Sequence, residues 1–357
     1  MITEIFAKEK FKEDEQWIVK NLLLETQMGS YAYGCQTENS DVDLVGIVMD
    51  RHQCLFPQQY GFILGFDNIP TFNNVEYKGE SNRIILDNRK TCEGVWHSLT
   101  NFFSLVENGS PSLTEVLFAR RNMVLYGHKI GFMLRDNRKM FLSMKMFHSF
   151  KGYAFMQLKR IRNHVKEWNE KKTCDNNNRR EYFEKFGYDV KQAYHCLRLI
   201  DLIDQLIKIG DLDLMRDKEE CKAMRNGEWG NWEKFENYVS QKLIELETYV
   251  NTNPVAIPLR APHEPLHEFL TNLIEEYYGS EGEMKKQKTE YITAKSVMSK
   301  LEEINSKIDK IPVTAPYGVK PTIFTPNHRF LLKNRYGKLV YVTLEEIYNN
   351  RNKYNKH

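Results

Sequence analysis

The 357-residue chain lacks long apolar runs, closely spaced cysteine pairs, internal repeats and a marked excess of charge of either sign. Without an apolar run of about 20 residues no membrane-spanning helix is predicted, and we expect no signal peptide. The formal net charge of +3 provides no global field that would indicate nucleic acid as a partner. The six cysteines have neither Cys-x-x-Cys nor zinc-finger spacing, as is typical of reduced thiols, and we expect a cytoplasmic protein.

The most informative stretch runs from residue 22 to residue 49. An apolar strand is followed by Gly29 and Ser30, a short aromatic turn, a polar loop and a second strand. Gly29 permits close approach of the backbone to a ligand, and Ser30 opens a helical turn that could hold phosphate. Asp41 and Asp43 stand two apart on the second strand, so both carboxylates leave the same face. Such acids repel each other unless cations bind there, and hard oxygen ligands suit Mg²⁺; a solvated edge strand is the alternative.

The segments GSYAYG and SDVDLVGI in this stretch resemble the signature of the DNA polymerase beta nucleotidyltransferase superfamily. More narrowly, they are similar to predicted nucleotidyltransferases described as RNA-ligase-associated, some of which bacteriophages carry. The resemblance implies transfer of an NMP from an NTP such as ATP to an acceptor hydroxyl, with release of pyrophosphate and two Mg²⁺ ions. It favours RNA over a protein or a small molecule as the acceptor. The alternative is a non-catalytic nucleotide-binding or interaction protein that retains the fold.

The superfamily also requires a third carboxylate on a neighbouring strand, and the resemblance places Glu93 there. A short strand at residues 92–95 precedes a helix, an Asn-Gly-Ser-Pro break and a second helix, as in the resembled family, which more often has Asp at this position. We therefore expect Glu93 to join the two aspartates as a catalytic metal ligand. Glu76, Asp87 and Glu115 are the alternatives. For Glu115 we favour a structural role near a helix start, where an acid complements the helix dipole.

The segment from 187 to 210 predicts a helix that is apolar on most of its circumference. Lys191, His195 and Arg198 are spaced i, i+4 and i+7, so they fall within about 60° of one another at about 100° per residue. Three basic groups in one stripe of an otherwise buried helix indicate an anionic partner such as a triphosphate. A stripe that faces water, or a core histidine with ion-paired neighbours, is the alternative. The resembled family carries a helix of this spacing, which implies nucleotide contact by all three.

Residues 151–185 contain ten basic and five acidic side chains, which form either a solvated helix face or a surface that follows phosphates. Together with the resemblance, these patterns predict an α+β fold. We expect a polymerase-beta-like nucleotidyltransferase core, a mixed sheet with helices, at 1–125 and a mainly helical domain at 126–310. A basic C-terminal appendage with a β-hairpin is expected at 311–357. The resemblance fades near residue 280, and we expect the active site between the first two domains.

Overall fold

The structure, a computed structural model, describes residues 1–38, 40–63, 68–87, 89–172, 177–279, 329–333 and 339–343. The chain divides into two units, Met1–Tyr277 and Tyr278–His357. In the second unit the described residues form β7 (Arg329–Lys333) and β8 (Leu339–Thr343), which pair antiparallel, so the predicted hairpin is confirmed. The end of the predicted helical domain and the start of the appendage lie outside the described residues. Along the described part of the chain, no helix combines the length and apolarity that crossing a membrane requires.

The first unit is built on a six-stranded sheet in the order β3-β5-β2-β1-β6, with β4 paired to β5. Strands β2 and β5 run parallel and the other pairs are antiparallel, which confirms the predicted mixed sheet. The expected strand, glycine-serine turn and second strand are present as β1, the short helix α3 and β2. The strands are β1 (Leu22–Met28), β2 (Val42–Val48), β3 (Asn74–Tyr77), β4 (Ile84–Ile85), β5 (Thr91–Ser98) and β6 (Val124–Gly127).

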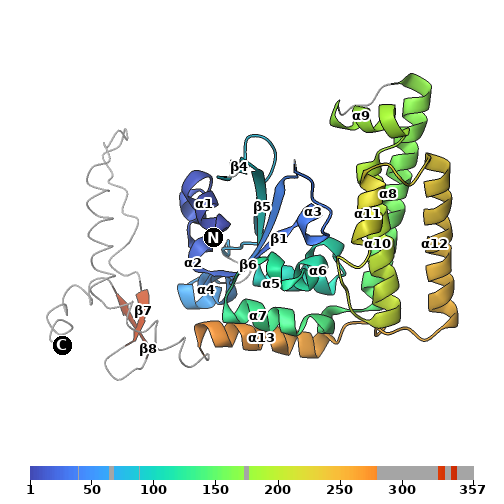
Figure 1. Cartoon of the computed structure of the whole chain (residues 1–357). Coiled ribbons are helices and arrows are strands. Elements are labelled where there is room, and N and C mark those ends of the chain that lie inside the picture. The colour runs from blue at the N-terminus through green and yellow to red at the C-terminus, as the bar shows by residue number, and fades with distance from the viewer. Residues whose placement is uncertain are drawn as a thin grey trace, which may run out of the picture. The chain divides into compact units, whose positions relative to one another are not determined.

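Short helices surround this sheet (Figure 1). Local sequence explains where two of them begin. Ser98 caps the N-terminus of α5 by accepting a hydrogen bond from Asn101 N at 3.2 Å, and Pro111 is the first residue of α6. The α-helices are α1 (Ile2–Glu9), α2 (Trp17–Lys20), α3 (Gly29–Ala32), α4 (His52–Leu55), α5 (Leu99–Glu107), α6 (Pro111–Phe118) and α7 (Lys129–Asp136). Short 3₁₀ helices lie between them; those within the described residues are η1 (Glu13–Glu15), η2 (Pro57–Tyr60), η3 (Arg121–Met123) and η4 (Arg138–Phe141).

A helical region follows, in which α10 packs against α8, α11 and α12 (Figure 1). The predicted helix from 187 to 210 is confirmed, because Asp189 caps it and Gly210 ends it at φ 65°. Its apolar circumference is buried, as expected for a helix enclosed by others. The helices are α8 (Met144–Lys171), α9 (Asn177–Phe186), α10 (Val190–Ile209), α11 (Lys218–Arg225), α12 (Trp232–Thr252) and α13 (His263–Tyr278).

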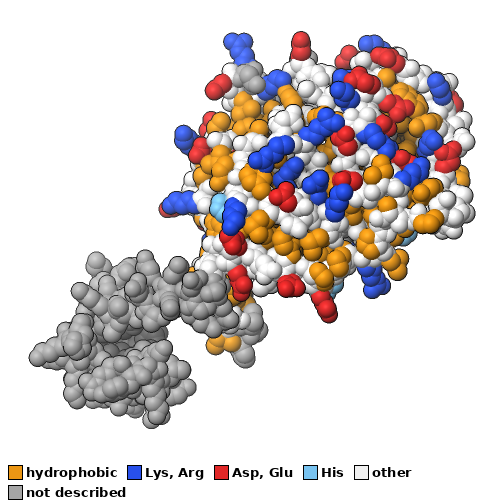
Figure 2. Space-filling model, turned by 60° about the horizontal axis from the view of Figure 1, so that its bottom comes forward, with side chains coloured by type: hydrophobic (Ala, Val, Ile, Leu, Met, Phe, Trp, Pro, Cys, Tyr) orange, Lys and Arg blue, Asp and Glu red, His pale blue; other side chains and the backbone are white. Residues whose placement is uncertain are grey.

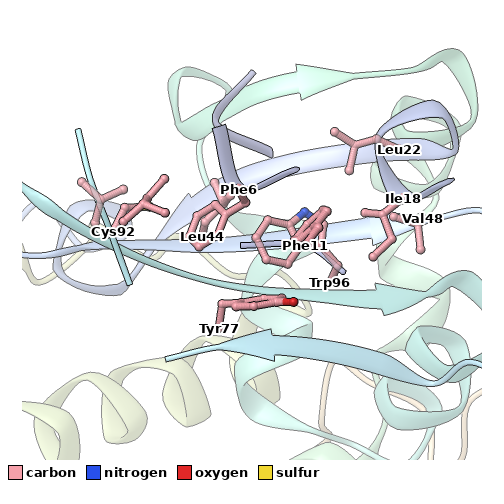
Figure 3. Packing of buried hydrophobic residues seen from close by; sticks show 11 residues of the cluster. Phe6, Phe11, Ile18, Leu22, Leu44, Val48, Tyr77, Cys92 and Trp96 are labelled. Atoms are coloured by element: carbon pink, nitrogen blue, oxygen red, sulfur yellow. The ribbon is translucent and has the colours of Figure 1, made fainter. Parts of the chain in front are cut away.

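One face of the sheet carries an aromatic core around Trp96 of β5 (Figure 3). The rings of Phe6 and Phe11 meet the indole edge-on, each with a centroid separation of 4.9 Å. The indole lies against two glycines, since a Cβ on Gly46 would come within 2.1 Å of Trp96 Cδ1 and one on Gly94 within 2.4 Å of Trp96 Cη2. Both positions therefore have to be glycine for the indole to lie flat on β2 and β5.

Glu25, a fully buried acid in β1, fixes helix α1 against the sheet. Its carboxylate accepts hydrogen bonds from Ile2 N at 3.0 Å and Thr3 N at 2.8 Å. The Thr3 hydroxyl also donates to Glu25 and accepts from Trp96 Nε1 at 2.9 Å. Because the first N–H groups of a helix have no intrahelical partner and carry positive partial charge, this buried acid satisfies them.

We expect Gly46→Ala to lower the free energy of unfolding by about 1–3 kcal/mol, because the added methyl group overpacks the Trp96 ring. Gly152→Ala is the matched control, since Gly152 lies in α8 with no atom within 4 Å of an added Cβ. The control should raise the free energy of unfolding by up to about 1 kcal/mol, as alanine favours helix over glycine. Urea denaturation measures both; equal stability of the two variants would contradict the packing described here.

Candidate functional site

Three acids lie where the neighbouring strands β2 and β5 begin, at one end of the sheet. Asp43 and Glu93 are register partners in these parallel strands, and both lie on the face opposite Trp96. Asp41 directly precedes β2, and its carboxylate accepts a hydrogen bond from the Thr91 hydroxyl. Asp43 and Glu93 line a cavity of about 340 Å³ that the end of α5 and the start of α6 border. The structure thus places the three predicted acids on two neighbouring strand starts, although their carboxylate oxygens do not all lie within 4.8 Å of one another.

The surroundings of Asp43 oppose its negative charge. Burial raises the pKa of this carboxyl above its ordinary value, and the nearby charges of Glu93 and Asp41 raise it further. The Lys191 ammonium acts in the opposite direction and lowers it, so this lysine of α10 lies within electrostatic reach of the acids. A cation placed among the three carboxylates would relieve their repulsion. Their oxygen atoms are the donors that Mg²⁺ prefers.

Gly29 closes this arrangement from the end of β1. Its φ is 61°, and a Cβ at this position would lie 1.8 Å from Asp43 Oδ2. Both the left-handed backbone and the contact require glycine. Ser30 follows in α3 and is partly exposed beside it. The lack of a side chain at Gly29 therefore lets the Asp43 carboxylate lie directly against the end of β1. The oxygen ligands of the three acids fit a hydrated divalent cation.

None of the three alternatives to Glu93 is in register with Asp43. Glu76 pairs in register with Val95, two positions further along β5, and forms an ion pair with Lys78, although it borders the same cavity. Asp87 is exposed in a turn. Glu115 is buried within α6. Among the four candidates, Glu93 is the one in register with Asp43, and its role as a metal ligand stays a prediction.

The predicted stripe on α10 borders a second cavity, of about 390 Å³. Lys191 is exposed there, whereas burial lowers the pKa of His195 well below its ordinary value and Arg198 and Lys191 add to that effect. The imidazole is therefore neutral at physiological pH. The cavity holds one acid, Asp189, at 3.4 Å from Arg179. Its basic lining residues are Lys191, His195, Arg198, Arg160 of α8 and Arg179 of α9.

Only 13% of the Arg198 side chain is exposed, so this residue is more buried than a side chain on a water-facing stripe would be. Its guanidinium lies 3.6 Å from the Glu115 carboxylate, donates to the Tyr194 hydroxyl at 3.1 Å and stacks 4.2 Å from the centre of the Tyr33 ring. Burial raises the pKa of Glu115, and the Arg198 charge lowers it. Glu115 thus has a structural role, but an ion pair to α10 provides it and not the helix dipole that we expected.

Arg160 and Arg179 belong to the basic run at 151–185, for which the sequence predicts only a surface and no common pocket. The excess of basic residues was the available signal, but helices α8 and α9 had to fold against α10 before these two could be singled out. A further link between the sheet and the helices, from Arg225 to the Cys35 carbonyl, has no signal in the sequence.

Replacing Arg198 with alanine should lower the free energy of unfolding by about 3–5 kcal/mol, because Glu115 would remain buried without its cation. A Glu115→Leu/Arg198→Met double variant should recover most of that loss, since both charges are removed together. Chemical denaturation of the single and double variants measures the difference. Unchanged stability of Arg198→Ala would show that the ion pair does not join α6 to α10.

Two comparisons with known proteins bear on this site. A search of curated proteins returned no match. A family model described as RNA repair pathway DNA polymerase beta family matches residues 4–212, which is more than half of the chain and includes the sheet, the three acids and the stripe on α10. The match ends before α11, so the resemblance between residue 213 and about residue 280 stays an interpretation. The resemblance read from the motifs is confirmed, and the chain belongs to this family of polymerase-beta-like nucleotidyltransferases.

Proposed function

We propose that this protein transfers an NMP from an NTP to an acceptor hydroxyl, with Mg²⁺ as cofactor and pyrophosphate as the second product. The observation that carries the proposal is the register of β2 and β5, which sets Glu93 beside Asp43 with Asp41 at the strand start. Asp41, Asp43 and Glu93 would hold the metal ions. When bound there, Mg²⁺ supplies Lewis-acid activation of the acceptor hydroxyl and stabilises negative charge on the leaving pyrophosphate.

The nucleotide phosphates would lie between the end of β1 and α10. Gly29 lets the Asp43 carboxylate lie against the backbone at the end of β1, and Ser30 offers a hydroxyl and the N–H groups of the short turn. Lys191 is exposed within electrostatic reach of Asp43 and provides a mobile positive charge for the triphosphate. Neutral His195 can share a hydrogen bond. Arg198, whose Nε–H is buried and makes no hydrogen bond within the described residues, would add its positive charge from the wall of the basic cavity.

We favour an RNA end as the acceptor. The matched family is described as belonging to an RNA repair pathway. The basic cavity on α10 concentrates positive charge in one place, whereas basic and acidic side chains are interspersed over the face shown in Figure 2. A local basic pocket suits a terminal phosphate better than it suits a long duplex, which requires an extended positive surface.

The direct test incubates the protein with each labelled NTP, Mg²⁺ and RNA, DNA or no acceptor. We expect pyrophosphate release that depends on RNA, together with a label on the RNA. A label on DNA or on the protein itself would move the proposal to another acceptor. Nucleotide binding without transfer to any acceptor would instead support a non-catalytic binding protein.

Asp41→Asn and Asp43→Asn should each abolish transfer and leave the fold intact, because each removes one ligand charge. Without divalent cations, Asp43→Asn should raise the melting temperature near neutral pH, since the native carboxylate is destabilised by burial and by its acidic neighbours. A raised native pKa means that protonation relieves this cost, so the difference from wild type should shrink as the pH falls. Transfer assays and thermal melting at several pH values check both outcomes.

Glu93→Gln should abolish transfer in the same way, whereas Glu76→Gln and Asp87→Asn should retain most of it. Glu76 is the matched control, because it borders the same cavity but is paired with Lys78 and is out of register with Asp43. Loss of activity in Glu76→Gln with full activity in Glu93→Gln would exchange their assigned roles.

Lys191→Ala should weaken NTP binding by about 1.5–3 kcal/mol, the usual loss for a hydrogen bond between charged groups. The melting temperature should not change, since the side chain is exposed. Lys159→Ala is the control, because Lys159 is also exposed but does not line the basic cavity. Titration of a non-hydrolysable NTP with Mg²⁺ measures the affinities; equal binding by both variants would contradict nucleotide contact by Lys191.

A further inference from the structure

Glu107, His263 and His267 form a cluster that the nucleotidyltransfer proposal does not use. Glu107 is the last residue of α5, whereas the two histidines stand four apart at the start of α13. One potential ligand atom from each residue lies within 4.8 Å of the other two. Among the described residues, no other group of three or more histidine, cysteine and acidic side chains converges in this way.

The distances within the cluster suit a small transition-metal ion. Glu107 Oε1 is 2.7 Å from His263 Nδ1, and Oε2 is 3.7 Å from His267 Nε2, so the carboxylate faces both rings. Bonds of about 2.0–2.1 Å in tetrahedral geometry separate ligand atoms by about 3.3 Å. The hydrogen-bonded Glu107–His263 pair would therefore open and the Glu107–His267 pair would close, each by about half an ångström. Small rotations of exposed side chains would therefore suffice to bring all three onto one ion.

The donor set indicates which ion would bind. Two imidazole nitrogens and one carboxylate oxygen favour zinc and similar divalent transition metals, whereas Mg²⁺ prefers oxygen ligands alone. The side chains of His263 and His267 are 69% and 57% exposed, so an ion can enter and keep a water ligand. His263 and His267 are spaced i, i+4 on α13, so their rings lie on the same side of the helix, with centroids 4.0 Å apart.

We propose that Glu107, His263 and His267 bind one zinc-class divalent ion that joins α5 to α13. Helix α13 already buries Leu266 and Leu273 within the first unit, and the metal would fix its N-terminal turn to the end of α5. Because α5 directly follows β5, the strand that carries Glu93, the ion would also restrain the helix behind the acidic edge.

The test uses the full chain, stripped of metal with a chelator and returned to buffer with excess Mg²⁺. Calorimetric titration with zinc chloride should show one site per chain, and His267→Ala, His263→Ala and Glu107→Gln should each weaken it at least about 10-fold. At one zinc concentration, the melting temperature of the wild type should rise more than that of these variants, because weaker binding stabilises the folded state less.

His148→Ala is the matched control, since His148 is exposed on α8 and lies outside the cluster. All six cysteines remain in every variant, so zinc binding by thiols would not differ between them. Asp43→Asn should bind zinc like the wild type, which separates this site from the proposed Mg²⁺ site. Superimposable zinc titrations of the wild type and the three cluster variants would overturn the proposal.

Discussion

The parallel, in-register pairing of β2 with β5 is the constraint on which the rest of the molecule depends. On one face it sets Asp43 beside Glu93, and on the other it places the Trp96 indole over Gly46 and Gly94. Since successive side chains of a strand alternate between faces, a slip of one residue would exchange the acids with the aromatic core. Burial of the indole and of its aromatic neighbours on one face therefore fixes the position of the carboxylates on the other.

Helix α10 connects the sheet to the helical region through a stripe whose members differ in depth. Arg198 is buried against Glu115 and Tyr33, so it joins α10 to α6 and to the turn after β1. Lys191, two turns earlier, is exposed and within electrostatic reach of Asp43. The same stripe thus contains both a buried cation that joins elements of the fold and an exposed one. Arg225 of α11 adds a second link, to the backbone carbonyl of Cys35.

Much of the fold could be predicted because its signals are local. The apolar strands around Gly29 and Ser30, the Pro111 helix start and the apolar helix that ends at Gly210 are all present where the sequence placed them. The partner of Glu115 could not be predicted from local signals. Its position in a short helix suggested a dipole interaction, but its partner lies on a helix far along the chain, and nothing local to residue 115 indicates that pairing.

By itself, the sequence determined the family, the two strands, the paired aspartates and the spacing of the α10 stripe, because each depends on residues within a few turns or strand positions of one another. Only the tertiary structure decided that Glu93 and not Glu76 is in register with Asp43, and which stripe residue is buried. It alone brought Glu107 to His263 and His267. The physical reason is that register and burial follow from packing of distant segments, and packing energy is not encoded in any single window of the chain.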